Sequence, residues 1–160
     1  MIAIVVAYAE NRGIGYEGEL PWRLPGDMRR FRELTSGGTV LMGRKTFQSL
    51  PDAYRPLPRR RNLVLSANPS FAAPGAELFG DVATALKGCG SDCFVIGGGT
   101  IYEQTLPRVC RVYATEVAGS PLSDTFFPEL PSEQWQRSEQ TAAISENGTS
   151  YRFAIYDRIA

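Results

Sequence analysis

Histidine is absent from the 160 residues of this sequence. The absence excludes a Ser-His-Asp triad, a Cys-His pair, an HExxH zinc site and a histidine general base. Any catalytic function must therefore rest on other side chains or on a bound cofactor.

Cysteine is scarce, and its three residues are Cys89, Cys93 and Cys110. An odd number without an evident disulfide framework is typical of reduced thiols, so we expect a cytoplasmic protein. The spacing Cys89-x-x-x-Cys93 offers two thiolates without a second pair. Because such a donor set is weak, we expect no metal site.

The sequence has no excess of charge of either sign, since 17 Lys and Arg balance 17 Asp and Glu. General nucleic-acid and anionic-membrane binders need a basic excess, so we expect neither partner. Long hydrophobic runs are missing too. The apolar residues 1–7 lack a basic flank, and Glu10 and Arg12 follow before a ~20-residue span is complete. These residues predict a buried strand instead.

One domain over residues 1–160 is expected, because the length suits a single core and no repeat or linker divides the chain. Its first two thirds alternate short apolar runs with helical segments, which predicts a mainly parallel sheet covered by helices. The strands are expected at 2–8, 40–42, 63–65 and 94–96, and the helices at 25–36, 81–87 and 100–106.

The last third has longer, more alternating runs at 109–118, 135–144 and 150–159. Asn147-Gly148 lies between the last two runs and is a strong hairpin signal. The sequence therefore predicts a mixed α/β sheet with a parallel centre and an antiparallel C-terminal edge.

A glycine-rich loop covers residues 9–23 and contains the apolar side chains of Ile14, Leu20 and Trp22. Long loops in compact domains are often functional, so this one is expected to close over an apolar ligand. A surface loop with a hydrophobic anchor is the alternative.

Asp27 is a carboxylate on the apolar stripe of the first helix, where helical spacing aligns it with Phe31 and Leu34. One interpretation is a first-turn acid favoured by the helix dipole. The other is a buried acid with a raised pKa that holds a cationic or amidine-like ring.

Three further segments suit anions. Gly97-Gly98-Gly99 joins a strand to a helix start and is a moderate signal for binding a nucleotide phosphate. The dinucleotide-binding fingerprint GxGxxG is not matched, because its last glycine would fall at Tyr102. Met42-Gly43-Arg44-Lys45-Thr46 follows another strand and is either a phosphate site or a solvated basic turn. In Arg59-Arg60-Arg61, one guanidinium could clamp a carboxylate.

Taken in order, these motifs resemble the dihydrofolate reductases of the bacterial chromosomal type. The residues that carry the resemblance are Ala7, Gly13-Ile14-Gly15, Leu20-Pro21-Trp22, Leu24-Pro25-x-Asp27, Phe31, Met42-Gly43-Arg44-x-Thr46, Pro56-Leu57-Pro58, Arg60-x-Asn62, Ile96-Gly97-Gly98-Gly99, Tyr102, Thr115 and Asp124-Thr125-x-Phe127-Pro128. The resemblance implies an eight-stranded mixed sheet flanked by four helices. It also implies a monomer that reduces 7,8-dihydrofolate with NADPH and binds antifolates of the methotrexate and trimethoprim type.

The resemblance also assigns the substrate site. Asp27 would bind the 2-amino group and N3 edge of the pterin, with Thr115 behind it, and would favour protonation of N5 by a water admitted under Leu20. Arg60 would clamp the glutamate tail. The implied catalytic residues are Asp27, Leu20, Trp22 and Thr115. The implied substrate-binding residues are Val5, Val6, Asp27, Met28, Phe31, Arg32, Leu50, Arg55, Leu57, Arg60 and Thr115.

For NADPH, the resemblance implies backbone contacts from Ala7 and Ile14, a 2′-phosphate site at Arg44 and Ser66, and a cis peptide at Gly97–Gly98. The implied cofactor-binding residues are Ala7, Gly13, Ile14, Gly15, Leu20, Gly43, Arg44, Lys45, Thr46, Leu65, Ser66, Ala67, Ile96, Gly97, Gly98, Gly99, Thr100, Ile101 and Tyr102.

Some positions depart from the family pattern. Thr100 and Gly80 stand where relatives carry basic residues, so phosphate discrimination is expected to depend on Arg44 and Lys45. Two other functions stay open: a pyrimidine reductase of riboflavin synthesis, and a non-catalytic nucleotide-binding module.

Overall fold

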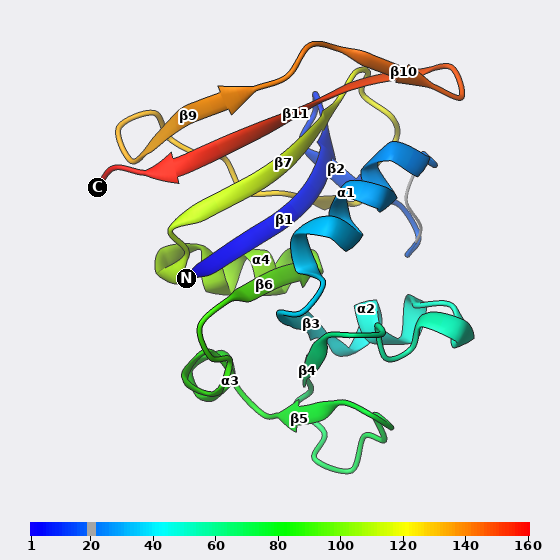
Figure 1. Ribbon diagram of the computed structural model, residues 1–160, viewed down its shortest axis with the longest axis vertical. Helices are drawn as coiled ribbons and strands as arrows, with labels where there is room; N and C mark the ends of the chain where they lie inside the picture. Colours follow the sequence, from blue (N-terminus) through cyan, green and yellow to red (C-terminus); the bar gives the residue numbers. More distant parts are fainter. Residues whose placement is uncertain (19–21) are drawn as a thin grey trace.

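A computed structural model describes residues 1–18 and 22–160 of the chain (Figure 1). The strands are β1 (Ile2–Ala9), β2 (Gly13–Gly15), β3 (Thr39–Gly43), β4 (Arg61–Leu65), β5 (Glu77–Phe79), β6 (Cys93–Gly97), β7 (Arg111–Val117), β8 (Thr125–Phe126), β9 (Trp135–Gln140), β10 (Ile144–Glu146) and β11 (Thr149–Arg158). The helices are α1 (Pro25–Thr35), α2 (Arg44–Ser49), α3 (Val82–Gly88) and α4 (Gly99–Thr105), with 3-10 turns at Asp52–Tyr54 and Leu106–Arg108. No helix of the described ranges is long and apolar enough to cross a membrane.

The main sheet has the strand order β10-β11-β7-β1-β6-β3-β4-β5. Pairs from β7 through β5 are parallel, whereas β11 runs antiparallel to β7, β9 and β10. Because β9 and β10 pair with successive parts of the same edge of β11, the described strands fill eight positions. The mixed eight-stranded sheet with a parallel centre and an antiparallel edge is confirmed.

Helices cover both faces of the sheet, as the side-chain alternation of β1 shows. Ala3 and Val5 pack with Phe31 of α1 and Phe47 of α2 on one face. The even-numbered residues of β1 pack on the other face, with Ala85 and Leu86 of α3 and Tyr102 of α4. A central strand covered on both sides must be apolar throughout, which explains the opening run of the sequence.

The expected helices begin and end within one residue of their predicted bounds. In α3, Asp81 is the N-cap and accepts a hydrogen bond from the backbone N–H of Thr84 at 2.8 Å. In α1, the helix ends at Thr35, and Gly37 follows with a φ of +82°.

The hairpin at Asn147-Gly148 is confirmed, with φ values of +51° and +76° at the two turn residues. The expectation of one strand over 135–144 is wrong, because β9 ends at Gln140 and β10 begins only at Ile144. Residues 136–143 are all exposed, so no buried face fixes their register along β11, and the pairing slips between Ile155 and Tyr156.

Candidate active site

The site lies where parallel strands end together. β1, β3 and β6 run parallel, so their carboxyl ends at Ala9, Gly43 and Gly97 share one edge of the sheet. In parallel sheets this edge is where ligands bind, because the loops and helix starts that follow the strands converge there.

Asp27 lies in the first turn of α1, half-buried against the sheet. Its Oδ1 accepts a hydrogen bond from Thr115 Oγ1 at 2.5 Å. Thr115 belongs to β7, is 3% exposed, and is paired in register with Ala7 of β1. The acid is therefore fixed to the centre of the sheet.

Burial raises the pKa of the Asp27 carboxyl above its usual value, and the charge of Glu146 adds to the increase. The Thr115 hydrogen bond and the Arg30 guanidinium act in the opposite direction. Arg30 lies three residues along α1, with its guanidinium carbon 4.2 Å from the centre of the Phe153 ring. The structure therefore favours a buried acid at Asp27 over a solvated first-turn acid.

Apolar side chains of the expected substrate site come together beside α1. Val5, Phe31, Leu50 and Leu57 belong to one cluster. Val6 lies in the cluster on the opposite face of the sheet, as alternation along β1 requires, so the structure does not bring it to this group. Met28 is 59% exposed on the outer side of α1.

Arg60 lies against the same helix. It donates to Thr35 Oγ1 at 3.0 Å, and its guanidinium carbon is 5.8 Å from the centre of the Phe31 ring. Burial and the nearby charges of Arg59 and Arg32 lower the pKa of Arg60. Mutual repulsion among these cations makes the cluster a good place for an anionic group.

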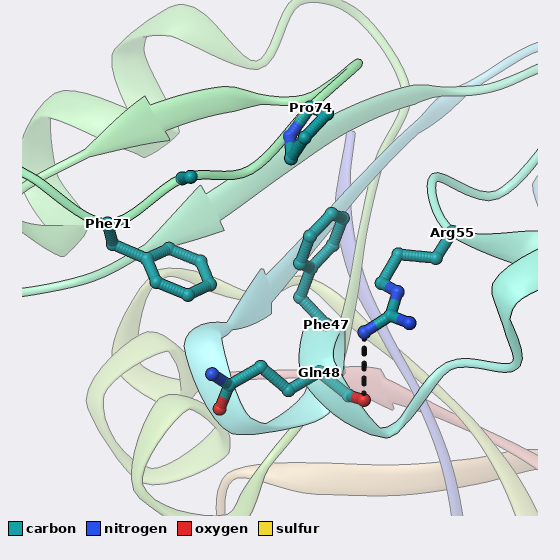
Figure 2. Close-up of a pocket in the computed structure, with 6 residues that line it drawn as sticks. Phe47, Gln48, Arg55, Phe71 and Pro74 are labelled. Carbon is teal, nitrogen blue, oxygen red and sulfur yellow. Dashed lines mark hydrogen bonds between the residues drawn. The ribbon is translucent and has the colours of Figure 1, made fainter.

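Arg55 lies in a groove of about 300 Å³ that Phe47, Phe71 and Pro74 also line (Figure 2). Its guanidinium pairs with Asp52 and donates to the backbone carbonyl of Gln48 at 3.3 Å. None of the other expected substrate residues lines this groove, although Phe47 belongs to the cluster that contains Phe31, Leu50 and Leu57.

The glycine turn after β6 is tightly packed. The Gly97–Gly98 peptide is cis, which confirms that expectation, and Gly97 has a φ of +125°. A Cβ at Gly99 would lie 2.7 Å from Thr125 Cγ2, and one at Gly43 would lie 3.1 Å from Ile101 Cγ1. Glycine is favoured at these positions, because a side chain at Gly99 would force Thr125 to move and one at Gly43 would press on Ile101.

A cavity of about 170 Å³ lies beside α4 and is lined by four of the expected cofactor residues: Leu65, Ser66, Ala67 and Ile101. It is also lined by Gly80, where the sequence lacks the basic residue of some relatives, and by three residues that the sequence did not indicate: Asp81, Val82 and Gln104. Gly80 and Asp81 follow β5, a strand of three residues that carries no sequence signal.

Of the expected phosphate-binding cations, Arg44 and Lys45 both lie exposed at the start of α2. The guanidinium carbon of Arg44 is 5.4 Å from the centre of the Phe71 ring. Thr100 is exposed on α4, and Thr46 lies close to Gly98.

The loop of residues 9–23 is anchored at both ends. Gly13–Gly15 form β2, which pairs with β8. The backbone N–H of Asp124 donates to the carbonyl oxygen of Gly15 at 3.0 Å. Ile14 Cδ1 would lie 3.8 Å from a Cβ at Gly99, which brings this strand to the glycine turn. Trp22 packs against the cluster of Leu24, Val117 and Tyr151. The expected gate residue Leu20 lies outside the described residues.

A half-buried carboxylate packed against a parallel sheet, together with a strand–glycine–helix turn at the carboxyl edge of that sheet, is typical of an α/β enzyme that binds a nucleotide and a second ligand. A family model described as dihydrofolate reductase matches residues 1–158. The dihydrofolate reductase of Mycobacterium tuberculosis is 42% identical over 161 residues, which cover 99% of this chain and 98% of that protein. The chain belongs to the dihydrofolate reductase family.

Other relatives agree. The dihydrofolate reductase of Bacillus subtilis is 36% identical over 162 residues, covering 99% of this chain and 95% of that protein. The solved structure of dihydrofolate reductase from Enterococcus faecalis complexed with NADP(H) and RAB-propyl superposes with a TM-score of 0.89 at 30% identity, covering 99% and 96% of the two chains. NADPH-dependent reduction of dihydrofolate follows from family membership. Membership of this family rules out the two alternative functions, a pyrimidine reductase of riboflavin synthesis and a non-catalytic nucleotide-binding module.

Proposed function

We propose that Asp27 is the residue on which the reduction of 7,8-dihydrofolate to tetrahydrofolate by this chain depends. The observation that carries the proposal is a half-buried carboxylate with a raised pKa, held by Thr115 of β7, which is in register with Ala7 near the carboxyl end of β1. A carboxylate in that position can accept two hydrogen bonds from an amidine-like edge, here the 2-amino group and N3 of the pterin.

The surrounding side chains orient the substrate and exclude water. Phe31, Leu50 and Leu57 form the apolar walls in this proposal, together with Val5, and their shared cluster supports it. Thr115 holds the carboxylate in one orientation. A bound ring would therefore be aligned before reaction, which is how enzymes lower the entropic part of a barrier.

The reaction also requires that N5 of the pterin is protonated, and the chain must favour this protonation. A carboxylate bound to the N3 edge is on the far side of the ring system from N5, so Asp27 does not transfer that proton itself. Its negative charge instead stabilises the protonated substrate, and water delivers the proton. Because the site is partly desolvated, this charge acts more strongly than it would in water.

NADPH, when bound, supplies the hydride from its nicotinamide. The chain's own residues fit such a group: Gly43 and Gly97–Gly99 lie at the carboxyl ends of β3 and β6, and Ser66 lines a cavity that Ile101 of α4 also lines. We assign Arg44 and Ser66 to the 2′-phosphate, and Ala7 and Ile14 to backbone contacts with the carboxamide.

Arg60 is assigned to the α-carboxylate of the substrate's glutamate tail, with Arg32 beside it. The charge repulsion at Arg60 supports this role, since an anion relieves it.

We also propose that the chain acts as one domain and as a monomer in the cytoplasm, where its three thiols stay reduced. Methotrexate and trimethoprim would bind Asp27 through protonated diamino edges.

The test is the decay of absorbance at 340 nm with NADPH and dihydrofolate. Asp27→Asn is expected to lose most of this activity at neutral pH and to recover partly in acid, where the substrate is protonated without help. A loss of equal size at every pH would contradict the assigned role.

A further inference from the structure

The start of α1 lacks a cap of its own. Its N-cap residue is Leu24, whose side chain makes no capping hydrogen bond. The first N–H groups of a helix have no partner within the helix and need an acceptor from elsewhere. Gly26 finds one 120 positions away: its backbone N–H donates to Glu146 Oε1 at 2.9 Å.

Glu146 ends β10, and its side chain is held in place from β11. The Tyr151 hydroxyl donates to Glu146 Oε1 at 2.5 Å. On the next turn residue, Asn147 Nδ2 donates to the carbonyl of Arg23 at 3.2 Å. The β10–β11 hairpin therefore joins the chain on both sides of the first residue of α1 (Figure 1).

Glycine at position 26 permits this close approach. A Cβ there would lie 2.4 Å from the Tyr151 hydroxyl oxygen and 3.0 Å from Glu146 Oε1. A side chain would therefore displace the Tyr151 hydroxyl or the Glu146 carboxylate from the helix start. The residue after Gly26 is Asp27.

Glu146 also acts on Asp27 through its charge. Hydrogen bonds from Tyr151 and from Gly26 lower the pKa of Glu146, so it is ionised at neutral pH. The groups that interact electrostatically or by hydrogen bond with the Asp27 carboxyl are Arg30 of α1, Thr115 of β7, Glu146 of β10, Tyr151 of β11 and, from the other face of the sheet, Tyr102 of α4. Among these, Arg30 is the cation and Glu146 the second anion.

We propose that Glu146 is a positioning residue for the reduction: it caps the first turn of α1, fixes the Asp27 carboxylate against Thr115, and strengthens the negative potential at the pterin edge. The proposal rests on the proposed role of Asp27. A hairpin from the end of the chain thus adjusts an acid near its beginning.

Glu146→Gln separates charge from position, because the amide oxygen can still accept from Gly26 while the negative charge is lost. Loss of an anion lowers the proton affinity of nearby groups, whether the titrating group is Asp27 or the substrate bound to it. We therefore expect the upper limb of the pH profile of kcat/KM for dihydrofolate to move down by roughly half a pH unit. The KM for NADPH should stay unchanged.

Glu146→Ala removes the acceptor as well. Because the first turn of α1 then loses the contact next to Asp27, the dissociation constant of a folate analogue should rise more than in Glu146→Gln. The matched control is Glu133→Gln, which loses the same charge from an exposed position before β9 and should leave the profile in place.

The proposal is overturned if the profile of Glu146→Gln superimposes on that of the parent, or moves equally in Glu133→Gln. These outcomes are distinguishable from failure of the Asp27 role. That role is judged on Asp27→Asn in the parent background, where a pH-independent loss of activity would refute it whatever Glu146 does.

Discussion

Asp27 shows how one residue acquires its chemistry from its surroundings. Its carboxyl is desolvated by burial, held by one hydroxyl and placed between a cation, Arg30, and an anion, Glu146. Sequence reasoning identified the acid because it lies on an apolar helix face. It missed Arg30, although the spacing of three residues along α1 was a usable signal. It missed Glu146 because no local pattern links residues 120 positions apart.

Arg44 carries a prediction at the same scale. If it holds the 2′-phosphate that NADH lacks, Arg44→Ala should raise the KM for NADPH about tenfold, which corresponds to one charged hydrogen bond of about 1.4 kcal/mol, and leave the KM for NADH nearly unchanged. Initial rates with each cofactor measure both values.

Lys87→Ala is the matched control for Arg44→Ala, since it removes an exposed cation from the last turn of α3. Equal increases of KM for NADPH and NADH in Arg44→Ala would remove the residue from 2′-phosphate recognition.

At the scale of elements, the sequence was a good guide wherever the signal was local. β1 is a continuous apolar run, α3 begins at an aspartate cap, and the Asn147-Gly148 turn has both residues in the left-handed region. It gave no helix of its own for the six-residue α2, and it missed the strands β2, β5 and β8, which have three residues or fewer. Their pairing depends on partners distant in the chain, so no pattern of their own could reveal them.

The β10–β11 turn gives a prediction at this scale. Gly148 has a φ of +76° with open space around its Cα, so a side chain there is strained but not crowded. Gly148→Ala should lower the free energy of unfolding by about 1 kcal/mol. Urea denaturation followed by tryptophan fluorescence measures the change.

Gly80→Ala serves as the control in the same assay, because Gly80 also has open space around it but its φ lies outside the left-handed region. A loss of stability as large as that of Gly148→Ala would show that the left-handed turn is not the cause.

At the scale of the whole molecule, the sheet order assembles the site. β11, β7 and β1 are neighbours, so Glu146 and Tyr151 near the end of the chain reach the helix that follows β1. The class of fold could be predicted because alternating strands and helices leave few topologies. The cavity beside Ser66 could not be predicted, because three separate segments line it.

Cofactor binding should stabilise the entire fold, since the proposed NADPH residues come from most of the sheet. NADPH at about 100 times its dissociation constant contributes about 2.7 kcal/mol, which should raise the Tm by roughly 5–11 °C. Thermal unfolding with NADPH, and with NADH at the same concentration, measures it. A shift as large with NADH would contradict selection by the 2′-phosphate.

The titration of the Asp27 carboxyl tests the account most directly. Carbon-13 NMR of the protein labelled at aspartate side-chain carboxyls, assigned by the signal lost in Asp27→Asn, gives its midpoint without substrate or cofactor. Burial predicts a midpoint clearly above the usual value of about 3.9, and a further increase in Thr115→Val, which removes the hydrogen bond that favours the ionised form. A midpoint at or below the usual value would show a solvated acid and contradict the mechanism.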